Sequence, residues 1–212
     1  GADGSHVVYA IRSRQLATCT WTEEDGNVMP VVGGPSAKLE WLKEWLAERG
    51  FMERDEMADN SAKVVIVSQF SKVLHWLKGE LNAMGLDARV LDGSASGAER
   101  IAIQEEFQDG ELRIVLLSGG MGVGINLDAA DDLIMVDSPY DPDRIEQIED
   151  RVHRASNMHS VTIWNLIALG TIDQAIMESV AKRYKVTREL MDGERGVNFE
   201  RNVVAKLRKE NK

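Results

Sequence analysis

Five short apolar runs, rich in valine, isoleucine and leucine, recur along the chain, and each ends at polar or glycine residues. Continuous apolar runs of this length are typical of strands that are buried on both faces of a parallel sheet. The runs occupy residues 63–70, 88–93, 113–120, 132–138 and 161–167. We therefore expect a single, mostly parallel sheet.

Segments with helical periodicity lie between and around these runs. Ser71 is expected to cap a helix that continues to Met84, and Asp141 followed by Pro142 is expected to open another. Thr171 starts a capping-box pattern with Gln174 and leads a long helix toward Gly193. Two further helices are expected at residues 36–49 and 97–108. Because strands and helices alternate, the pattern predicts an α/β fold with helices on both faces of a central sheet.

The helix after Pro142 carries two stripes of residues. The apolar stripe, which would pack on the core, comprises Ile145, Ile148, Val152 and Ala155. The polar stripe has spacings of four and then three, which bring its residues onto one helical face. It comprises Gln147, Arg151 and Arg154. Two arginines beside a core-facing stripe are candidates for binding an anion.

The overall charge limits what that anion could be. The 212 residues include 25 basic and 35 acidic side chains, a formal charge of −10, which argues against a broad basic surface for nucleic acid. Any phosphate binding is therefore expected to be local. Cys19 is the only cysteine, which excludes an intramolecular disulfide and favours a reducing compartment. No apolar run approaches the ~20 residues needed to cross a membrane.

A glycine-rich stretch, GGMGVGINL, follows the run that ends at Ser118. Its glycines are Gly119, Gly120, Gly122 and Gly124. At the carboxyl end of a strand, such a stretch lets the backbone turn tightly and approach a phosphate. A dinucleotide-binding loop would need GxGxxG, and the third glycine is missing here. A tight turn that binds no ligand is the simpler alternative.

A phosphate-binding P-loop, GxxxxGK[ST], does not occur in the sequence. The acidic stretch at residues 55–58, DEMA, imitates a magnesium-binding motif, but no apolar strand precedes it. Asp137 ends an apolar run and is better placed to hold a metal, although an aspartate there more commonly caps a loop. We assign no metal ligand.

The chain thus has arginines suited to phosphates but no cradle for a triphosphate. An arginine that one lobe supplies to a nucleotide on another lobe offsets the charge that builds on the transferring phosphoryl group. Arg151 and Arg154 are candidates for this role. The alternative is that they form surface ion pairs with the acidic residues of the same helix, Glu146, Glu149 and Asp150.

From about Lys38 to Gly193, the chain resembles the second RecA-like lobe of helicase superfamily two, and most closely that of Swi/Snf-type DNA translocases. QIEDRVHR is similar to the sixth motif of that family, SGGMGVGINL to the fifth, and VVIVSQF to the fourth. LDGSASGAER, DSPYDPDR and GTIDQAIMESVAKR also match family segments in the family's order. RSRQLATCTW and GGPSAKLEWL stand where the family has an arginine-glutamine helix and an SxK motif. Gly119 departs from the pattern, because an arginine or lysine is common there.

This resemblance implies a RecA-like three-layer fold and the second motor lobe of an ATP-dependent DNA helicase or translocase. ATP and Mg²⁺ would be held mainly by an N-terminal RecA-like lobe outside this sequence, and the lobe alone would be inactive. Arg151 and Arg154 would reach the γ-phosphate. The other residues implied to bind ATP are Gln147, Gly122, Gly124 and Asn126. The residues implied to touch DNA, without reading its sequence, are Ser68, Gln69, Gly93, Ser94, Ser118 and Gly119.

The expected organisation follows from these motifs. Residues 1–6, GADGSH, are typical of a cloning remnant, residues 7–35 would be a leading segment and linker, 36–193 the lobe, and 194–212 a charged tail. The divergent motifs look more like those of bacterial or bacteriophage members, which implies a cytoplasmic location. Two other functions stay open: a lobe without catalysis that docks a basic partner on its acidic surface, and a nucleotide-dependent oxidoreductase that uses the glycine stretch.

Overall fold

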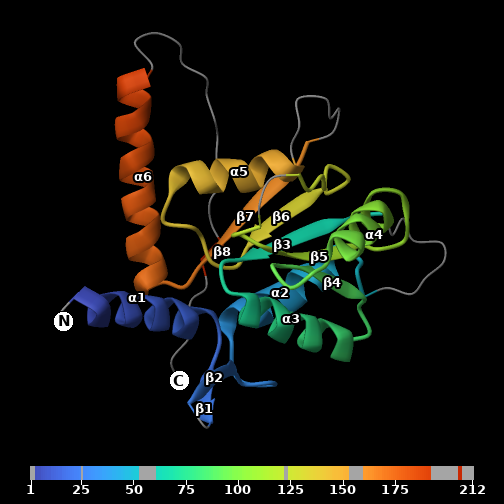
Figure 1. Ribbon diagram of the computed structural model, residues 1–212, viewed down its shortest axis with the longest axis horizontal. Coiled ribbons are helices and arrows are strands. Elements are labelled where there is room, and N and C mark those ends of the chain that lie inside the picture. The colour runs from blue at the N-terminus through green and yellow to red at the C-terminus, as the bar shows by residue number, and fades with distance from the viewer. Residues whose placement is uncertain are drawn as a thin grey trace.

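The computed structural model describes residues 3–24, 26–52, 61–121, 124–152, 160–191 and 205–206 (Figure 1). Its central sheet has six strands in the order β4-β5-β3-β6-β7-β8, and every neighbouring pair is parallel. The strands are β3 (Val64–Ser68), β4 (Ala88–Leu91), β5 (Ile114–Ser118), β6 (Asp132–Met135), β7 (Thr162–Ile167) and β8 (Ala205–Lys206). The five predicted strands are all present, and β8 adds a short strand within the predicted tail.

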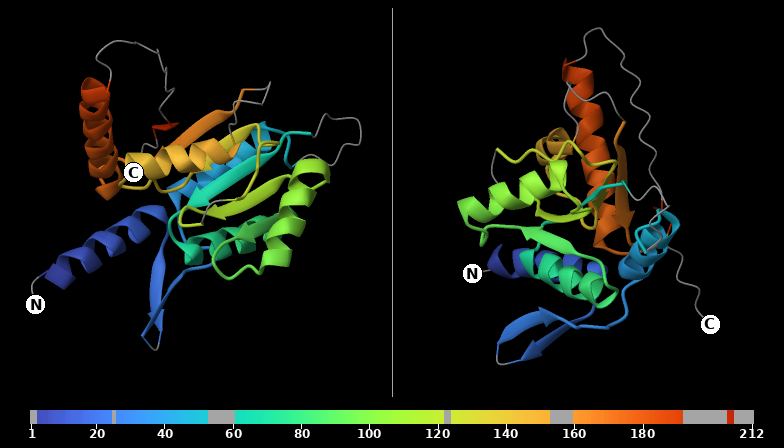
Figure 2. Two further views of the ribbon diagram at one scale, coloured as in Figure 1. Left: turned by 45° about the horizontal axis from the view of Figure 1, so that its top comes forward. Right: turned by 90° about the vertical axis from the view of Figure 1, so that its right-hand side faces the viewer.

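Helices cover both faces of the sheet (Figure 2). On one face, α2 (Ala37–Glu48) and α3 (Ser71–Ala83) share a core with alternate strand residues such as Val64 and Ile66. On the other face, α4 (Gly97–Asp109), α5 (Pro142–Val152) and α6 (Ile172–Met191) pack against residues such as Val65 and Val67. All residues of β3 and β5 are buried, as expected for strands covered on both sides. This three-layer arrangement confirms the predicted α/β fold.

Three helix starts show how local chemistry sets the boundaries. Ser36 caps α2, because its side chain accepts a hydrogen bond from the Leu39 N–H at 3.1 Å. The prediction that Ser71 caps α3 is wrong: Ser71 is the first helical residue, and Phe70 precedes it without a side-chain cap. The helix begins this early because the Phe70 carbonyl already accepts from the Val73 N–H at 2.9 Å.

The start of α6 differs from the predicted capping box by one residue. The Thr171 hydroxyl accepts from the Asp173 N–H at 3.2 Å, and the Gln174 side chain accepts from the Gly170 N–H at 3.2 Å. Both predicted side chains therefore stabilise the helix start. A capping box would instead have Thr171 accept from the Gln174 N–H and Gln174 accept from the Thr171 N–H.

A helix and a hairpin precede the sheet, where we expected a leading segment and linker. The helix α1 (Asp3–Thr18) begins within residues 1–6, and it lies beside the start of α6 (Figure 1). The hairpin consists of β1 (Trp21–Glu24) and β2 (Asn27–Pro30). It contacts α3, since Lys72 Nζ donates to the Val28 carbonyl at 2.8 Å. Within the described ranges, no helix combines the length and apolar character that a bilayer crossing requires.

We predict that Phe107→Ala lowers the free energy of unfolding by about 3–5 kcal/mol, because Phe107 is fully buried and its removal leaves a cavity. Ile101→Ala on the same helix is the control. Its side chain is 60% exposed, and we expect a change within about 0.5 kcal/mol. Urea unfolding followed by circular dichroism measures both, and equal losses would contradict the placement of α4.

Candidate functional site

The carboxyl ends of β5, β3 and β6 meet at one edge of the sheet. Ser68 at the end of β3 pairs in register with Ser118 at the end of β5, and the chain after β6 brings Asp137 to the same edge. From this edge, β3 continues into α3 on one face, whereas the segments after β5 and β6 pack on the other face. Such a switch in direction is where open α/β sheets bind ligands.

Asp137 is the organising side chain of this edge. Its carboxylate accepts hydrogen bonds from Ser68 Oγ at 2.5 Å and from the Gln69 N–H at 2.9 Å. Burial raises the pKa of the Asp137 carboxyl, while the bonds from Ser68 and Gln69 act in the opposite direction. Asp137 thus caps the turn after β3, the commoner of the two roles considered for it. Among the described residues, no group of three or more potential metal ligands occurs.

Gln69 lies directly over the start of the glycine stretch. The Gly119 N–H donates to the Ser68 carbonyl at 3.0 Å, which joins β5 to the β3 exit. A Cβ atom on residue 119 would lie 1.8 Å from Gln69 Nε2, so the amide group occupies the space that a side chain would need. Gln69 Nε2 is itself buried without a hydrogen-bond partner. The Gln69 amide thus occupies the place in which the resemblance led us to expect an arginine or lysine side chain at residue 119.

The loop after β4 carries Gly93 and Ser94, and both are exposed. Asp92 shapes this loop, because its carboxylate accepts from the Ser94 N–H at 2.9 Å and from Ser94 Oγ at 2.6 Å. His75 Nε2 lies 2.9 Å from the same carboxylate. Burial raises the pKa of Asp92, but the bonds from Ser94 and His75 outweigh it and hold that pKa below its usual value.

The six residues expected to contact DNA therefore fall into two groups. Gly93 and Ser94 are exposed and Gln69 is partly so. Ser68, Ser118 and Gly119 are buried and shape the edge from beneath. The Ser68 hydroxyl is engaged by Asp137, and the Ser118 hydroxyl accepts weakly from the Gly120 N–H at 3.4 Å. Gly120, which we named among the glycines that could approach a phosphate but not among the DNA contacts, is also exposed at this edge.

Three residues of the predicted apolar stripe of α5, Ile145, Ile148 and Val152, are buried in the core, and the fourth, Ala155, lies outside the described residues. Arg151 Nη2 donates to the carbonyl of Met121 in the glycine stretch at 2.5 Å. Arg151 Nη1 is buried and has no hydrogen-bond partner, and burial lowers the pKa of this guanidinium. Gln147, one turn earlier, is exposed. The described residues thus include no carboxylate that pairs with Arg151.

Two further residues that the resemblance implies to bind ATP, Gly124 and Asn126, lie near the end of the glycine stretch. Gly124 has φ +112°, a conformation that L side chains rarely adopt. Asn126 is partly buried, and its Oδ1 atom has no hydrogen-bond partner. Arg154 and Gly122 lie outside the described residues.

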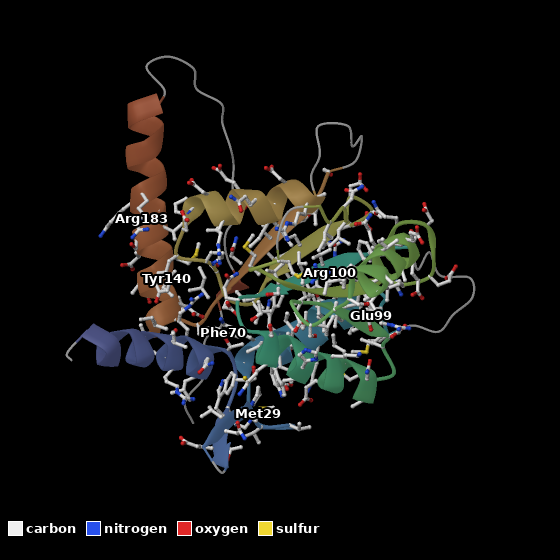
Figure 3. All side chains as sticks on the ribbon, viewed as in Figure 1. Met29, Phe70, Glu99, Arg100, Tyr140 and Arg183 are labelled. Atoms are coloured by element: carbon white, nitrogen blue, oxygen red, sulfur yellow. The ribbon has the colours of Figure 1, made fainter. Side chains whose placement is uncertain are left out.

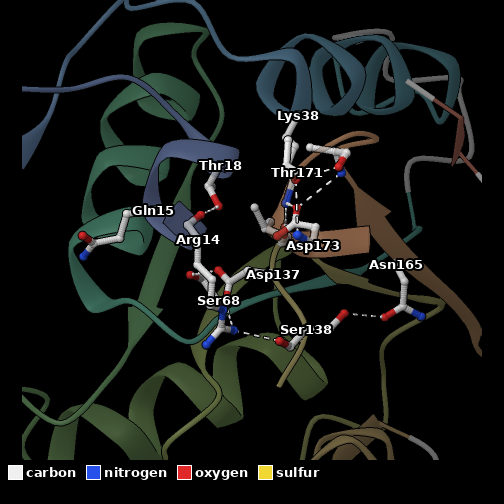
Figure 4. A network of polar contacts seen from close by, with 12 residues as sticks. Arg14, Gln15, Thr18, Lys38, Ser68, Asp137, Ser138, Asn165, Thr171 and Asp173 are labelled. Atoms are coloured by element: carbon white, nitrogen blue, oxygen red, sulfur yellow. Dashed lines mark hydrogen bonds and ion pairs between the residues drawn. The ribbon is translucent and has the colours of Figure 1, made fainter. Parts of the chain in front are cut away.

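Two buried cations at this edge were not singled out from the sequence as site residues (Figure 4). Arg14 of α1 donates from Nη2 to the Ser138 carbonyl at 2.7 Å and lies 3.5 Å from Asp137. Its guanidinium also faces the rings of Phe70 and Tyr140. Lys38 of α2 donates to Asp173 and to the Val136 carbonyl. The only signals for them were the arginine-glutamine and SxK segments of the resemblance.

A family model described as "Helicase conserved C-terminal domain" matches residues 37–156, which is more than half of the chain. The human lymphoid-specific helicase is 33% identical over 155 residues, which cover 69% of this chain and 18% of that protein. A Drosophila melanogaster protein described as a homolog of a SWI/SNF-related regulator of chromatin is 32% identical over 147 residues, covering 68% of this chain and 17% of its own length. The chain therefore spans less than a fifth of these curated relatives.

Two solved structures share the fold. The C-terminal part of the Fun30 ATPase domain is 31% identical with a TM-score of 0.59, and the match covers 68% of this chain and 45% of that one. The Sulfolobus solfataricus SWI2/SNF2 ATPase core, solved in complex with dsDNA, is 26% identical with a TM-score of 0.59, covering 74% and 31%. Together with the family match, these likenesses establish that the chain belongs to the helicase conserved C-terminal domain family and is of the SWI2/SNF2 type.

Proposed function

We propose that this chain is the second motor lobe of an ATP-dependent DNA helicase or translocase, and that it supplies arginine fingers to ATP held on a first lobe. The relatives named above include one helicase and an ATPase core, which supports a motor role for the parent protein. The observation that carries the proposal is Arg151, a cation beside the glycine stretch with one buried nitrogen that lacks a partner.

The surroundings of Arg151 fit a phosphate ligand. Arginine stays protonated at neutral pH in proteins, so a buried guanidinium nitrogen without an acceptor is costly to retain for stability alone. A γ-phosphate oxygen brought by a closing first lobe would satisfy Nη1 while Nη2 keeps its bond to the Met121 carbonyl. Bound ATP with Mg²⁺ would supply the phosphoryl group that is transferred to water. Arg151 and Arg154 would offset the charge that develops on it.

Other residues would complete the nucleotide side of the lobe. Gln147 is exposed one turn before Arg151 and would orient that face. Gly122 and Gly124 would line the cleft between the lobes, and Asn126 would contribute at its end. The Asn126 Oδ1 atom, buried and without a partner, is the feature that supports including this residue.

Nucleic acid would bind along the carboxyl edge of the sheet. The exposed backbone of Gly93 would offer a neutral hydrogen-bond donor to a phosphate. Ser94 would donate once released from the Asp92 carboxylate, and Gln69 once its buried amide turns outward, while Ser68, Ser118 and Gly119 shape the edge. Contacts to the backbone alone carry no sequence information, so binding would tolerate any sequence. Few cations are needed for such a track, which agrees with the net charge of −10. The dsDNA complex of the Sulfolobus relative supports this assignment.

The organism of origin and the cellular location are separate predictions. The bacterial or bacteriophage origin and cytoplasmic location suggested by the divergent motifs stay predictions. The curated relatives named above come from human and Drosophila melanogaster and lend them no support.

We predict that Arg151→Ala and Arg154→Ala, each introduced into the protein that carries both lobes, lower ATP turnover by on the order of 10³-fold, because the transferring phosphoryl group loses its cation. DNA affinity should stay nearly unchanged. Arg144→Ala, at an exposed position of the same helix, is the matched control and should retain turnover. Steady-state ATPase assays and fluorescence anisotropy measure the two quantities. Normal turnover in both variants would refute the arginine-finger role.

We predict that Gly119→Ala weakens DNA binding about fivefold, the equivalent of one net hydrogen bond of ~1 kcal/mol, because the new Cβ displaces the Gln69 amide. The free energy of unfolding should fall by less than about 1 kcal/mol, since the displaced group is the flexible end of a side chain. Gly120→Ala is the control, because its nearest neighbour would be 3.8 Å away and Gln69 would stay in place. Equal DNA affinities for the two variants would exclude Gln69 as a contact.

A further inference from the structure

Helix α4 begins at the loop that carries Gly93 and Ser94. Ser96 and Glu99 form a reciprocal capping box at the first turn, with the Ser96 N–H donating to Glu99 at 2.8 Å. Arg100 Nε donates to the Ala95 carbonyl at 2.9 Å. Figure 3 shows Glu99 and Arg100 at this end of the helix. The start of α4 is therefore tied to the loop at which nucleic acid is proposed to bind.

The second half of α4 holds the end of the glycine stretch and the residues directly after it. Gln104 and Gln108 are four residues apart and share one face of the helix. Gln104 Oε1 accepts from the Asn126 N–H at 3.0 Å, and Gln108 Oε1 accepts from the Ala129 N–H at 2.8 Å. Gln108 Nε2 also donates to Asp128 Oδ1. Two side-chain amides thus fix the backbone on either side of Leu127.

Leu127 connects the backbone that Gln104 and Gln108 hold to the arginine helix α5. Its side chain is fully buried, and its N–H donates to the backbone carbonyl of Arg151 at 3.0 Å. Arg151 therefore contacts the glycine stretch twice, through this carbonyl and through the bond from Nη2 to Met121. A shift of residues 126–129 would move the backbone from which the guanidinium projects.

The far end of α4 is anchored to the sheet. Lys63, directly before β3, donates from Nζ to the carbonyls of Phe107 at 2.5 Å and Gly110 at 2.9 Å. The Phe107 ring is fully buried in the core on this face. Because both ends are held, α4 can act as a rigid support for the segment that its glutamines bind.

We propose that Gln104 and Gln108 are positioning residues for Arg151, and that through them α4 connects the nucleic-acid loop to the arginine that acts on ATP. This inference rests on the proposed function, since it assigns Arg151 a role in turnover. Neither glutamine would touch ATP or nucleic acid. They would act by holding the Arg151 guanidinium in its productive position, and their loss would lower kcat without changing DNA affinity.

The test uses the protein with both lobes. Gln104→Leu keeps most of the side-chain volume but removes the acceptor for the Asn126 N–H. We expect kcat for ATP to fall about tenfold, since small misplacements of a catalytic group are costly, with DNA affinity unchanged. Hydrogen exchange at the Asn126 amide should become faster. Glu105→Gln, at an exposed position of the same helix, is the control and should change none of these.

A second pair of variants separates positioning from simple loss of packing. Gln104→Glu retains an oxygen that can accept from the Asn126 N–H, so kcat should stay near normal. Gln108→Glu places a carboxylate against that of Asp128, so the segment should be displaced and kcat should fall. If Gln104→Leu fails to fold, the two glutamate variants still test the positioning role. Equal kcat values for Gln104→Glu and Gln108→Glu would overturn the inference.

The outcome for Arg151 distinguishes the two proposals. If Arg151→Ala abolishes turnover while Gln104→Leu and Gln108→Glu retain normal kcat, the positioning role is excluded and the proposed function stands. If Arg151→Ala alone leaves turnover unchanged, the positioning inference fails. If Arg154→Ala leaves it unchanged as well, the proposed function itself fails.

Discussion

The buried carboxylate of Asp137 is the constraint around which the carboxyl edge of the sheet is arranged. A charge removed from water must be matched by donors or an opposite charge, and here Ser68, Gln69 and Arg14 supply them. These three residues come from the end of β3, the turn after it, and α1. The exit from β6, the exit from β3 and the helix that precedes the sheet are therefore held together at one point. Gln69 owes its position over Gly119 to this arrangement.

The sequence was sufficient to predict the layers of the fold because burial of the central strands is so complete. The run VVIV, residues 64–67, has no polar position on either face, which is the pattern of a strand covered on both sides. The apolar stripe of α5 was equally predictable from the sequence, since Ile145, Ile148 and Val152 follow helical spacing. In both cases the signal lies within a few neighbouring residues.

The polar interior could not be derived in this way. Arg14 contacts Ser138, which is 124 residues away, and Lys38 contacts Asp173 across 135 residues. Periodicity describes which face a residue occupies, but it does not identify a partner on another element. The predicted DNA contacts illustrate the same limit. Ser68 ends strand β3 and Ser94 follows strand β4, yet the first is buried against Asp137 and the second is exposed. Local sequence distinguishes them only once the neighbours are known.

The glycine at residue 119 has a consequence for how the proposed binding of nucleic acid at this edge would depend on salt concentration. A cationic side chain that meets a phosphate releases a condensed counterion, and affinity then falls steeply as ionic strength rises. With Gly119 and the Gln69 amide, the edge offers a neutral group instead and has no such ion to release. Binding at this position would depend on hydrogen-bond geometry and would persist at salt concentrations that weaken contacts made by lysine or arginine.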